Sequence, residues 1–362
     1  MRRVARSWLV VLLVILSLLA AACGDDDDSD TKAGGSSTET TAKSGGTDAA
    51  GKGKKIGLVY DIGGRGDKSF NDSAAEGLDK AKSDLGIDAK DLSPAAGGEN
   101  REELLRLVAQ SGYQLNFAVG FASTDALKKV AGEFPNLKFA IIDAVVDLPN
   151  VASLTFTEEQ GSYLVGAAAA LKSTSNHIGF IGGVDTDLIK KFEAGYVAGA
   201  KKIKPDIKID VKYITQPPDF SGFNDPAKGK EIGAAMYASG ADVVYHAAGG
   251  SGTGLFEAAK AASTASAKKW AIGVDGDQHE SADPTVRDFI LTSMLKKVSV
   301  AVYDTIDKFV KDDFKAGNTV YSLKDGGIDY ATSGGFVDDI KGQLDDLKKQ
   351  IIDGTIKVPT TP

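Results

Sequence analysis

From Lys54 to the C-terminus, short apolar runs alternate with segments whose apolar residues recur at the helical period. Strands that alternate with helices of this length predict parallel sheets with helices packed on their faces. The sequence therefore predicts an α/β fold. The runs that we interpret as strands are 56–60, 115–119, 139–142, 152–156, 178–181, 207–214, 243–245, 270–274 and 289–295.

Several helical segments carry signals at their ends or along one face. Apolar residues keep the 3.6-residue period over 74–85 and are followed by Gly86, a residue type that often ends a helix in the left-handed conformation. Asp225 and Pro226 have the pattern of an N-cap followed by proline at the first helical position. The stripe over 298–309 predicts another helix.

The residues that end the predicted strands indicate where a ligand binds. They are Asp61, Gly120, Asp143, Gly182, Ala247 and Asp275. In open α/β sheets, ligands bind beyond the carboxyl ends of the strands. Carboxylates accept paired hydroxyl donors, and glycines allow close approach of the backbone. The pattern therefore predicts a site for a polar, hydroxyl-rich ligand.

The N-terminus has the layout of a signal peptide over residues 1–22. A positively charged start is followed by the apolar run 8–19, which is too short for a comfortable transmembrane helix, and by three alanines that lead to Cys23. A cysteine in this place is typical of lipoproteins, in which it is acylated, commonly with palmitate, after cleavage. We expect a protein held at the extracytoplasmic face of the cell membrane by lipid on Cys23. An ordinary secretory signal with an incidental cysteine is the alternative.

Composition limits the remaining possibilities. Residues 23–53 are acidic and rich in Gly, Ser and Thr, which predicts a flexible tether. Cys23 is the only cysteine, so the core must form without an intramolecular disulfide. The net charge of −8 argues against nucleic acid as a partner.

Two glycine-rich segments follow predicted strands. Residues 61–71 lack the spacing of a dinucleotide-binding or phosphate-binding loop. Residues 249–254 are interpreted as a tight turn, with Gly250 offering its backbone to a neutral ligand. The three histidines are scattered, without the spacing of a metal site or a catalytic triad. We predict no catalytic residue, metal or cofactor, and we expect a monomer.

Seven motifs occur in a fixed order along the chain. They are Asp-x-Gly-Gly-x-x-Asp-Lys-Ser-Phe-Asn at 61–71, Gly-Phe-Ile-Gly-Gly at 179–183, Lys-Phe-Glu-Ala-Gly at 191–195, Phe-Asn-Asp-Pro-Ala-Lys-Gly at 223–229, Ala-Asp-Val-Val-Tyr-His-Ala-Ala-Gly-Gly at 241–250, Gly-Val-Asp-Gly-Asp-Gln at 273–278 and Thr-Ser-Met-Leu-Lys at 292–296. Together they resemble the basic membrane protein family, the PnrA-like nucleoside-binding lipoproteins of bacterial ABC transporters. The resemblance implies a two-lobed type I periplasmic-binding-protein fold, in which each lobe is a mainly parallel sheet flanked by helices. It also implies capture of a nucleoside, a purine nucleoside in the first place, for ABC permease and ATPase subunits.

The resemblance also implies residue roles. Phe70 would stack on the base beside polar contacts from Asn71 and Asp61, and Phe223 would close the other side of the base. The remaining expected contacts are Phe192 in the wall, Asp143 at the base edge, and Asp275 with Lys296 at the ribose hydroxyls.

Several alternatives stay open. The segment 216–221 resembles a small insertion, which leaves open whether Phe220 or Phe223 is the second stacking ring. Asp275 and Lys296 can also be read as a structural ion pair. A sugar-binding or ligand-sensing lipoprotein of the same fold is the alternative function, followed by a nucleoside hydrolase-type enzyme.

The expected lobes are discontinuous in sequence. We place residues 54–156 and 282–318 in the N-terminal lobe, and residues 157–281 and 319–362 in the C-terminal lobe.

Overall fold

The computed structural model of the protein describes residues 50–362, which belong to one structural unit. The predicted signal peptide (1–22), the lipidation site Cys23 and most of the predicted tether (23–53) lie outside the described residues. Within 50–362, no helix has the length and apolar character needed to cross a membrane.

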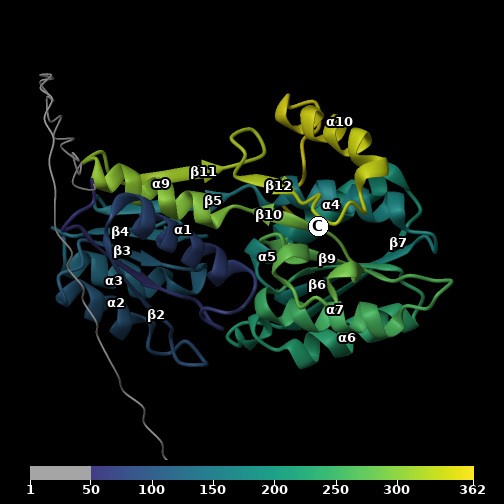
Figure 1. Ribbon diagram of the computed structural model, residues 1–362, viewed down its shortest axis with the longest axis horizontal. Helices are drawn as coiled ribbons and strands as arrows, with labels where there is room; N and C mark the ends of the chain where they lie inside the picture. The colour runs from purple at the N-terminus through teal and green to yellow at the C-terminus, as the bar shows by residue number, and fades with distance from the viewer. Residues whose placement is uncertain (1–49) are drawn as a thin grey trace, which may run out of the picture. The chain divides into compact units, whose positions relative to one another are not determined.

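The first lobe is built on a six-stranded parallel sheet with the order β11-β5-β4-β3-β1-β2. Apolar residues of α1 and α9 pack on one face of this sheet, and those of α2 and α3 pack on the other (Figure 1). The elements are β1 (Lys55–Val59), α1 (Phe70–Leu85), β2 (Asp88–Leu92), α2 (Arg101–Gln110), β3 (Leu115–Ala118), η1 (Phe121–Ser123), α3 (Thr124–Glu133), β4 (Lys138–Ile142), β5 (Val151–Phe156), α9 (Val298–Val310) and β11 (Gly317–Tyr321).

The second lobe is built on a sheet with the order β12-β10-β9-β8-β6-β7, in which only the β10–β12 pair is antiparallel among the described strands. Helices α4 and α5 cover one face, and α6 and α7 cover the other. The elements are α4 (Glu158–Lys172), β6 (His177–Val184), α5 (Asp187–Ile203), β7 (Lys208–Thr215), η2 (Ser221–Phe223), α6 (Pro226–Ala238), β8 (Val243–Ala247), η3 (Gly249–Ser251), α7 (Gly252–Ala262), β9 (Trp270–Asp275), α8 (Gln278–Ser281), η4 (Arg287–Phe289), β10 (Ile290–Lys296), β12 (Ile328–Tyr330), η5 (Asp338–Ile340) and α10 (Lys341–Ile352).

The chain crosses between the lobes three times, after β5, after β10 and after β11 (Figure 1). The predicted boundary at 282 is therefore wrong, because β10 adds to the second sheet beside β9, with Thr292 opposite Ile272. Only α9 and β11 return to the first lobe. The boundary at 318 is also shifted, because β11 pairs with β5 as far as Tyr321.

The nine predicted strands are present, and three more strands lie at sheet edges. The central strands β3, β4 and β8 are almost wholly buried, which explains their continuous apolar sequences. The unpredicted strands β2, β11 and β12 each pair on one side only, and their sequences contain polar residues or are very short. An edge strand needs no apolar run, so the sequence pattern did not reveal them.

The predicted helix ends are confirmed. Gly86 ends α1 with φ 70°, and its N–H donates to the Lys82 carbonyl. Asp225 accepts a hydrogen bond from the backbone of Lys228 at 2.9 Å, directly before α6.

The end of the predicted tether needs a correction. Residues 50–53 form a turn, in which the N–H of Gly51 donates to the carbonyl of Leu85 at 2.7 Å. Gly51 is buried, and a Cβ there would approach Ile87 to 2.6 Å. This turn therefore belongs to the fold and not to the tether.

Candidate functional site

A cavity lies at the carboxyl ends of the strands and is lined by residues of both lobes. The space between its walls, including the part that is open to solvent, amounts to about 550 Å³. Among the predicted site residues, Gly250 is absent from its lining and the preceding Gly249 takes that place. The other eight line it: Asp61, Phe70, Asn71, Asp143, Phe192, Phe223, Asp275 and Lys296.

The opening glycine-rich loop is held in place by two of its own side chains. The Asp67 carboxylate accepts hydrogen bonds from the backbone N–H groups of Ser69, Asn71 and Asp72, which satisfies donors at the start of α1. The Asn71 amide donates to the Ile62 carbonyl and to Asp67, and its oxygen accepts from the Asp61 N–H at 2.9 Å. Most hydrogen-bonding groups of the Asn71 side chain are therefore used within the loop.

Lys296, at the end of β10, is the cation of the cavity wall. It is 1 % exposed, its ammonium donates to Asp143 Oδ2, and Glu158 Oε1 lies 3.7 Å away. Burial lowers the pKa of Lys296, but the surrounding carboxylates outweigh burial and raise it overall. The predicted alternative of an Asp275–Lys296 ion pair is wrong, because the ammonium contacts Asp143 and Glu158 instead.

Three aromatic rings surround the same ammonium. Its nitrogen lies 4.8 Å from the centroid of Phe70, 5.2 Å from that of Phe156 and 5.7 Å from that of Phe192. A cation near ring faces is stabilised by their quadrupoles. Phe70 and Phe192 thus form a wall in which aromatic surface and positive charge adjoin.

Asp275 ends the buried strand β9, and Asp143 directly follows the buried strand β4. Both residues adopt left-handed backbone conformations, with φ of 66° for Asp275 and 68° for Asp143. Non-glycine residues in this region are uncommon, and such strain concentrates at functional sites. Asp275 Oδ2 accepts a hydrogen bond from the Ser69 hydroxyl of the other lobe at 2.5 Å. Burial raises the pKa of Asp275 to about 6. Burial likewise raises the pKa of Glu158, behind Lys296, to about 7.

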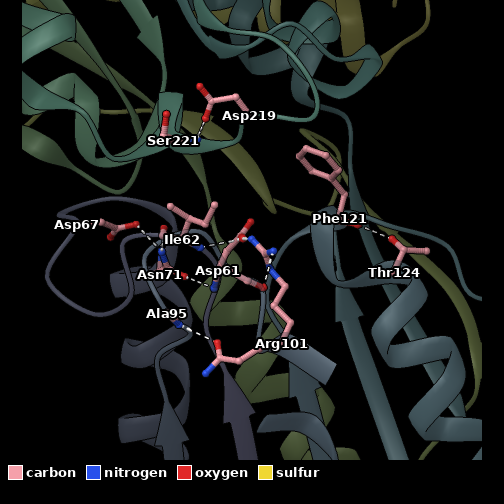
Figure 2. Close-up of polar contacts among 12 residues, drawn as sticks. Asp61, Ile62, Asp67, Asn71, Ala95, Arg101, Phe121, Thr124, Asp219 and Ser221 are labelled. Atoms are coloured by element: carbon pink, nitrogen blue, oxygen red, sulfur yellow. Dashed lines mark hydrogen bonds and ion pairs between the residues drawn. The ribbon is translucent and has the colours of Figure 1, made fainter. Parts of the chain in front are cut away.

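Two carboxylate oxygens at the cavity receive no hydrogen bond from residues 50–362. Asp143 Oδ1 is buried and receives no hydrogen bond from any described residue. Asp61 uses Oδ1 to accept from the N–H of Ile62 at 2.8 Å and from Arg101 at 2.9 Å, as Figure 2 shows, whereas its Oδ2 has no donor among residues 50–362. Burial raises the pKa of Asp61, and Arg101 opposes that rise.

The second lobe supplies most of the apolar wall. Leu188, Ile189 and Phe192 project from α5, and Phe223 ends η2. Phe220 is not part of the lining. The geometry therefore favours Phe223 as the ring that faces a ligand.

Phe121 was missed in the sequence. It lines the cavity from the first lobe and makes edge contacts with Phe220 at 5.8 Å and with Phe223 at 6.4 Å between ring centroids. Figure 2 shows its ring directed from the first lobe toward the Asp219–Ser221 segment. An aromatic directly after the strand-end glycine Gly120 was the signal that could have identified it.

The family model described as PnrA-like ABC transporter substrate-binding protein matches residues 54–362. The chain belongs to this family. It is 41 % identical over 325 residues to the ABC transporter nucleoside-binding protein BmpA of Lactococcus lactis subsp. cremoris, covering 84 % of this chain and 89 % of that relative. It is 34 % identical over 294 residues to an uncharacterised lipoprotein of Pyrococcus furiosus, covering 79 % and 72 % of the two chains.

A solved structure agrees with these matches. A solute-binding protein of an ABC transporter system from Aeropyrum pernix superposes with a TM-score of 0.75 at 31 % identity, over 85 % of this chain and 93 % of that one. The predicted resemblance to the PnrA-like family and the predicted two-lobed fold are therefore confirmed, and the protein is a substrate-binding protein of the ABC transporter type.

The histidine of the strand β8 is structural in this member of the PnrA-like family. His246 is buried outside the cavity lining, and its Nε2 lies 3.0 Å from Gln278 Oε1. Burial lowers the pKa of His246 to about 4, so the ring is neutral. Among residues 50–362, no three His, Cys, Asp or Glu side chains are grouped so that they could hold a metal ion.

Proposed function

We propose that the protein captures a nucleoside, a purine nucleoside in the first place, outside the cytoplasm for an ABC importer. The observation that carries this proposal is the combination of unpaired carboxylate oxygens with aromatic walls in one cavity. Asp143 Oδ1 is the clearest of these oxygens, because it is buried and lacks a donor among the described residues. A buried acceptor without a donor is costly unless a ligand supplies one.

The aromatic residues suit a planar base. Phe70 comes from the first lobe and Phe223 from the second, and both line the cavity. Stacking of a base on an aromatic ring contributes about 1–3 kcal/mol per ring in single-strand nucleic acid binding. We assign Phe70 and Phe223 to the two faces of the base, and Phe192 to the wall beside them.

The carboxylates suit hydroxyl and N–H donors. Asp275 would accept ribose hydroxyls, and charge-assisted hydrogen bonds of this kind are the stronger type. Asp143 and Asp61 would accept donors of the base edge. Lys296 pairs with Asp143 and can direct a further N–H toward the ribose, whereas Asn71 mainly fixes the loop.

The charge of the lining favours a ligand without phosphate. Four carboxylates and one ammonium line the cavity, from Asp61, Asp67, Asp143, Asp275 and Lys296. A nucleotide would bring its negative charge next to this excess of carboxylates, which is unfavourable at short range. We therefore propose nucleosides as the ligand class and exclude nucleotides from it.

The location and partners follow from the family and the N-terminus. The relative from Lactococcus lactis is named as nucleoside-binding, and the one from Pyrococcus furiosus as a lipoprotein. For this protein we propose acylation of Cys23, a position at the extracytoplasmic face of the membrane, and transfer of the ligand to a permease with its ATPase. We propose that it acts as a monomer without cofactor and without catalysis.

A thermal-shift screen of the purified protein tests this proposal. The ligands are purine and pyrimidine nucleosides, the matching nucleotides, free bases and pentoses. At a concentration 100 times Kd, a ligand that binds only the folded state adds about 2.7 kcal/mol, which raises Tm by several degrees. We expect this from at least one purine nucleoside and not from its 5′-monophosphate. If no nucleoside stabilises the protein, the proposed ligand class is wrong; stabilisation by ribose alone would support the sugar alternative.

Two further assays separate the other functions. Release of ribose during incubation with inosine would contradict a binding role and support hydrolase activity. Nucleoside uptake by a strain that lacks the gene distinguishes import from sensing, because a sensor could be lost without loss of uptake.

A further inference from the structure

Arg101 lies behind the Asp61 carboxylate and outside the cavity lining. It is the first residue of α2, and its Nη2 donates to Asp61 Oδ1 at 2.9 Å. Each of the two side chains is only 10 % exposed. The guanidinium therefore contacts a cavity residue from the protein side and cannot itself be reached through the lining residues.

The preceding turn is built around this guanidinium. Arg101 Nη1 donates to the Gly98 carbonyl at 2.8 Å, and Gly98 has φ 74°. A Cβ on Gly98 would collide with the guanidinium group. The Asn100 side chain accepts from the Ala95 N–H at 2.7 Å and closes the turn. Several local contacts thus fix the position of the charge before any contact with Asp61 is counted.

Asp61 has one orientation in this setting. Its Oδ1 accepts from Ile62 and Arg101, while Oδ2 lies against Gly120, where any Cβ would collide with it. Gly120 has φ 90°, a conformation that glycine adopts readily. The two oxygens of the carboxylate therefore differ: Oδ1 accepts from protein donors, and Oδ2 has no donor among residues 50–362.

We propose that Arg101 is a positioning residue for ligand binding, which orients the Asp61 carboxylate, favours its charged form and keeps Oδ2 available to an N–H or hydroxyl donor of the bound nucleoside. This inference rests on the proposed function. Loss of the guanidinium would leave a buried carboxylate beside Asp143 with only the Ile62 N–H as donor. The carboxyl would then take up a proton at higher pH and present a donor where the ligand needs an acceptor.

The charges that surround Asp61 support a rise in its pKa when Arg101 is lost. Burial raises the pKa of Asp61, Arg101 from α2 and the Ile62 N–H lower it, and Asp143 after β4 raises it. Asp67, Asp275 and Lys296 share the same cavity and would titrate or act in the same way in wild type and variant. A difference in Asp61 titration between the wild type and the Arg101 variant therefore reports on the Arg101–Asp61 pair alone.

Arg101→Met tests the proposal, with Arg106→Met as the matched control. Arg106 lies on the same helix and pairs at the surface with Glu102 and Glu133. Carboxyl carbon NMR without ligand, assigned with Asp61→Asn, should show a higher Asp61 pKa in Arg101→Met than in wild type and an unchanged one in Arg106→Met. This measurement needs no ligand, so its outcome is independent of whether the protein binds nucleosides.

Calorimetry with inosine between pH 5.5 and 8 provides the second readout. The ratio of Kd in Arg101→Met to Kd in wild type should rise about five- to tenfold from the alkaline to the acidic end, as protonation removes the acceptor. An unchanged Asp61 pKa, or a Kd ratio that is the same at every pH, would overturn the proposal. Arg101→Gln, which keeps hydrogen-bond donors but no charge, replaces Arg101→Met if that variant does not fold, and the same outcomes decide.

Discussion

The two lobes end their central strands at the same cavity but contribute polar and apolar side chains to it in different proportions. In the first lobe, Asp61 and Asp143 follow β1 and β4, on either side of the strand that precedes Gly120. In the second lobe, β8 ends at Ala247, and the neighbouring lining comes from α5 and Phe223. The first sheet therefore contributes most of the acceptors, and the second lobe contributes most of the apolar surface.

The polar groups that the second lobe contributes near the cavity make contacts with residues of the first lobe. Lys296 supplies the cation for Asp143 of the first lobe, and Asp275 accepts from Ser69 of the first lobe. The Gln278 amide also donates across the interface, to the Lys68 carbonyl at 2.9 Å. Lys296 and Asp143 thus form an ion pair across the two lobes, whereas the cation beside Asp61 comes from its own lobe. A ligand that contacts both lobes would favour this arrangement over a more open one.

The largest effect should come from the cross-lobe cation. In Lys296→Met, Asp143 and Glu158 lose their shared counter-charge in a buried place, and removal of one partner from a buried pair costs about 3–5 kcal/mol. We expect a loss of this size in the free energy of unfolding, measured in urea. Lys311→Met is the control, because its pair with Asp307 is exposed and its loss should leave the free energy of unfolding almost unchanged. Equal stability of the two variants would show that the cavity charges are not paired across the lobes.

Asp275→Asn should stabilise the free protein at neutral pH. Burial raises the folded-state pKa of Asp275 from 3.8 to about 6, so at pH 5 the folded protein keeps a proton that the unfolded chain has released. The contribution of Asp275 to the stability of the wild type therefore falls as pH rises between about 4 and 6, by about 2–3 kcal/mol. The amide does not titrate, so the stability of the variant relative to wild type should rise by this amount between pH 4 and pH 7. Urea unfolding at both pH values measures it; a constant difference would contradict the prediction.

The same substitution should weaken nucleoside binding more than about tenfold, because the charged acceptor for the ribose is lost. Calorimetry with a purine nucleoside measures this change. Greater stability together with weaker binding would show that the second-lobe carboxylate is kept for the ligand at a cost to the fold. Retained affinity would assign Asp275 to the contact with Ser69 alone.

Features that depend on local sequence were predictable. The buried runs, the strand-end carboxylates Asp61, Asp143 and Asp275, and the cap at Asp225 each have a signal within a few residues. The resemblance to the family then led to the prediction that Lys296 and Phe223 belong to the same ligand site. Gly250 stays a prediction, since the cavity lining includes the preceding Gly249 of the turn after β8.

Features that depend on tertiary pairing were not predictable. The sequence of β10 suits either sheet, and only its register beside β9 places it in the second lobe. Arg101 is separated from Asp61 by 40 residues and looks like any polar residue at a helix start. Lys296 was expected beside Asp275, but its partner Asp143 lies 153 residues away in the other lobe. Spacing in sequence carries no information on such pairs.

The apolar side of the comparison can be tested with Phe223→Ala. Since Phe223 lines the cavity and a stacked ring contributes about 1–3 kcal/mol, nucleoside affinity should fall about five- to 100-fold. Phe70→Ala, on the first lobe, should have an effect of similar size. A large loss for only one of the two variants would show that one lobe alone provides the stacking surface.

Phe220→Ala should have the smallest effect and separates the ring contact between the lobes from the cavity wall. Phe220 contacts Phe121 edge-on but does not line the cavity, so its removal takes away one partly buried aromatic contact between the lobes, worth about 0.5–1.5 kcal/mol. Phe121 keeps its contact with Phe223, so part of this interlobe energy is retained. We therefore expect nucleoside affinity to fall less than about threefold, through faster dissociation measured by stopped-flow fluorescence. A loss as large as that of Phe223→Ala would make Phe220 the second stacking ring and reverse the assignment that the cavity lining supports.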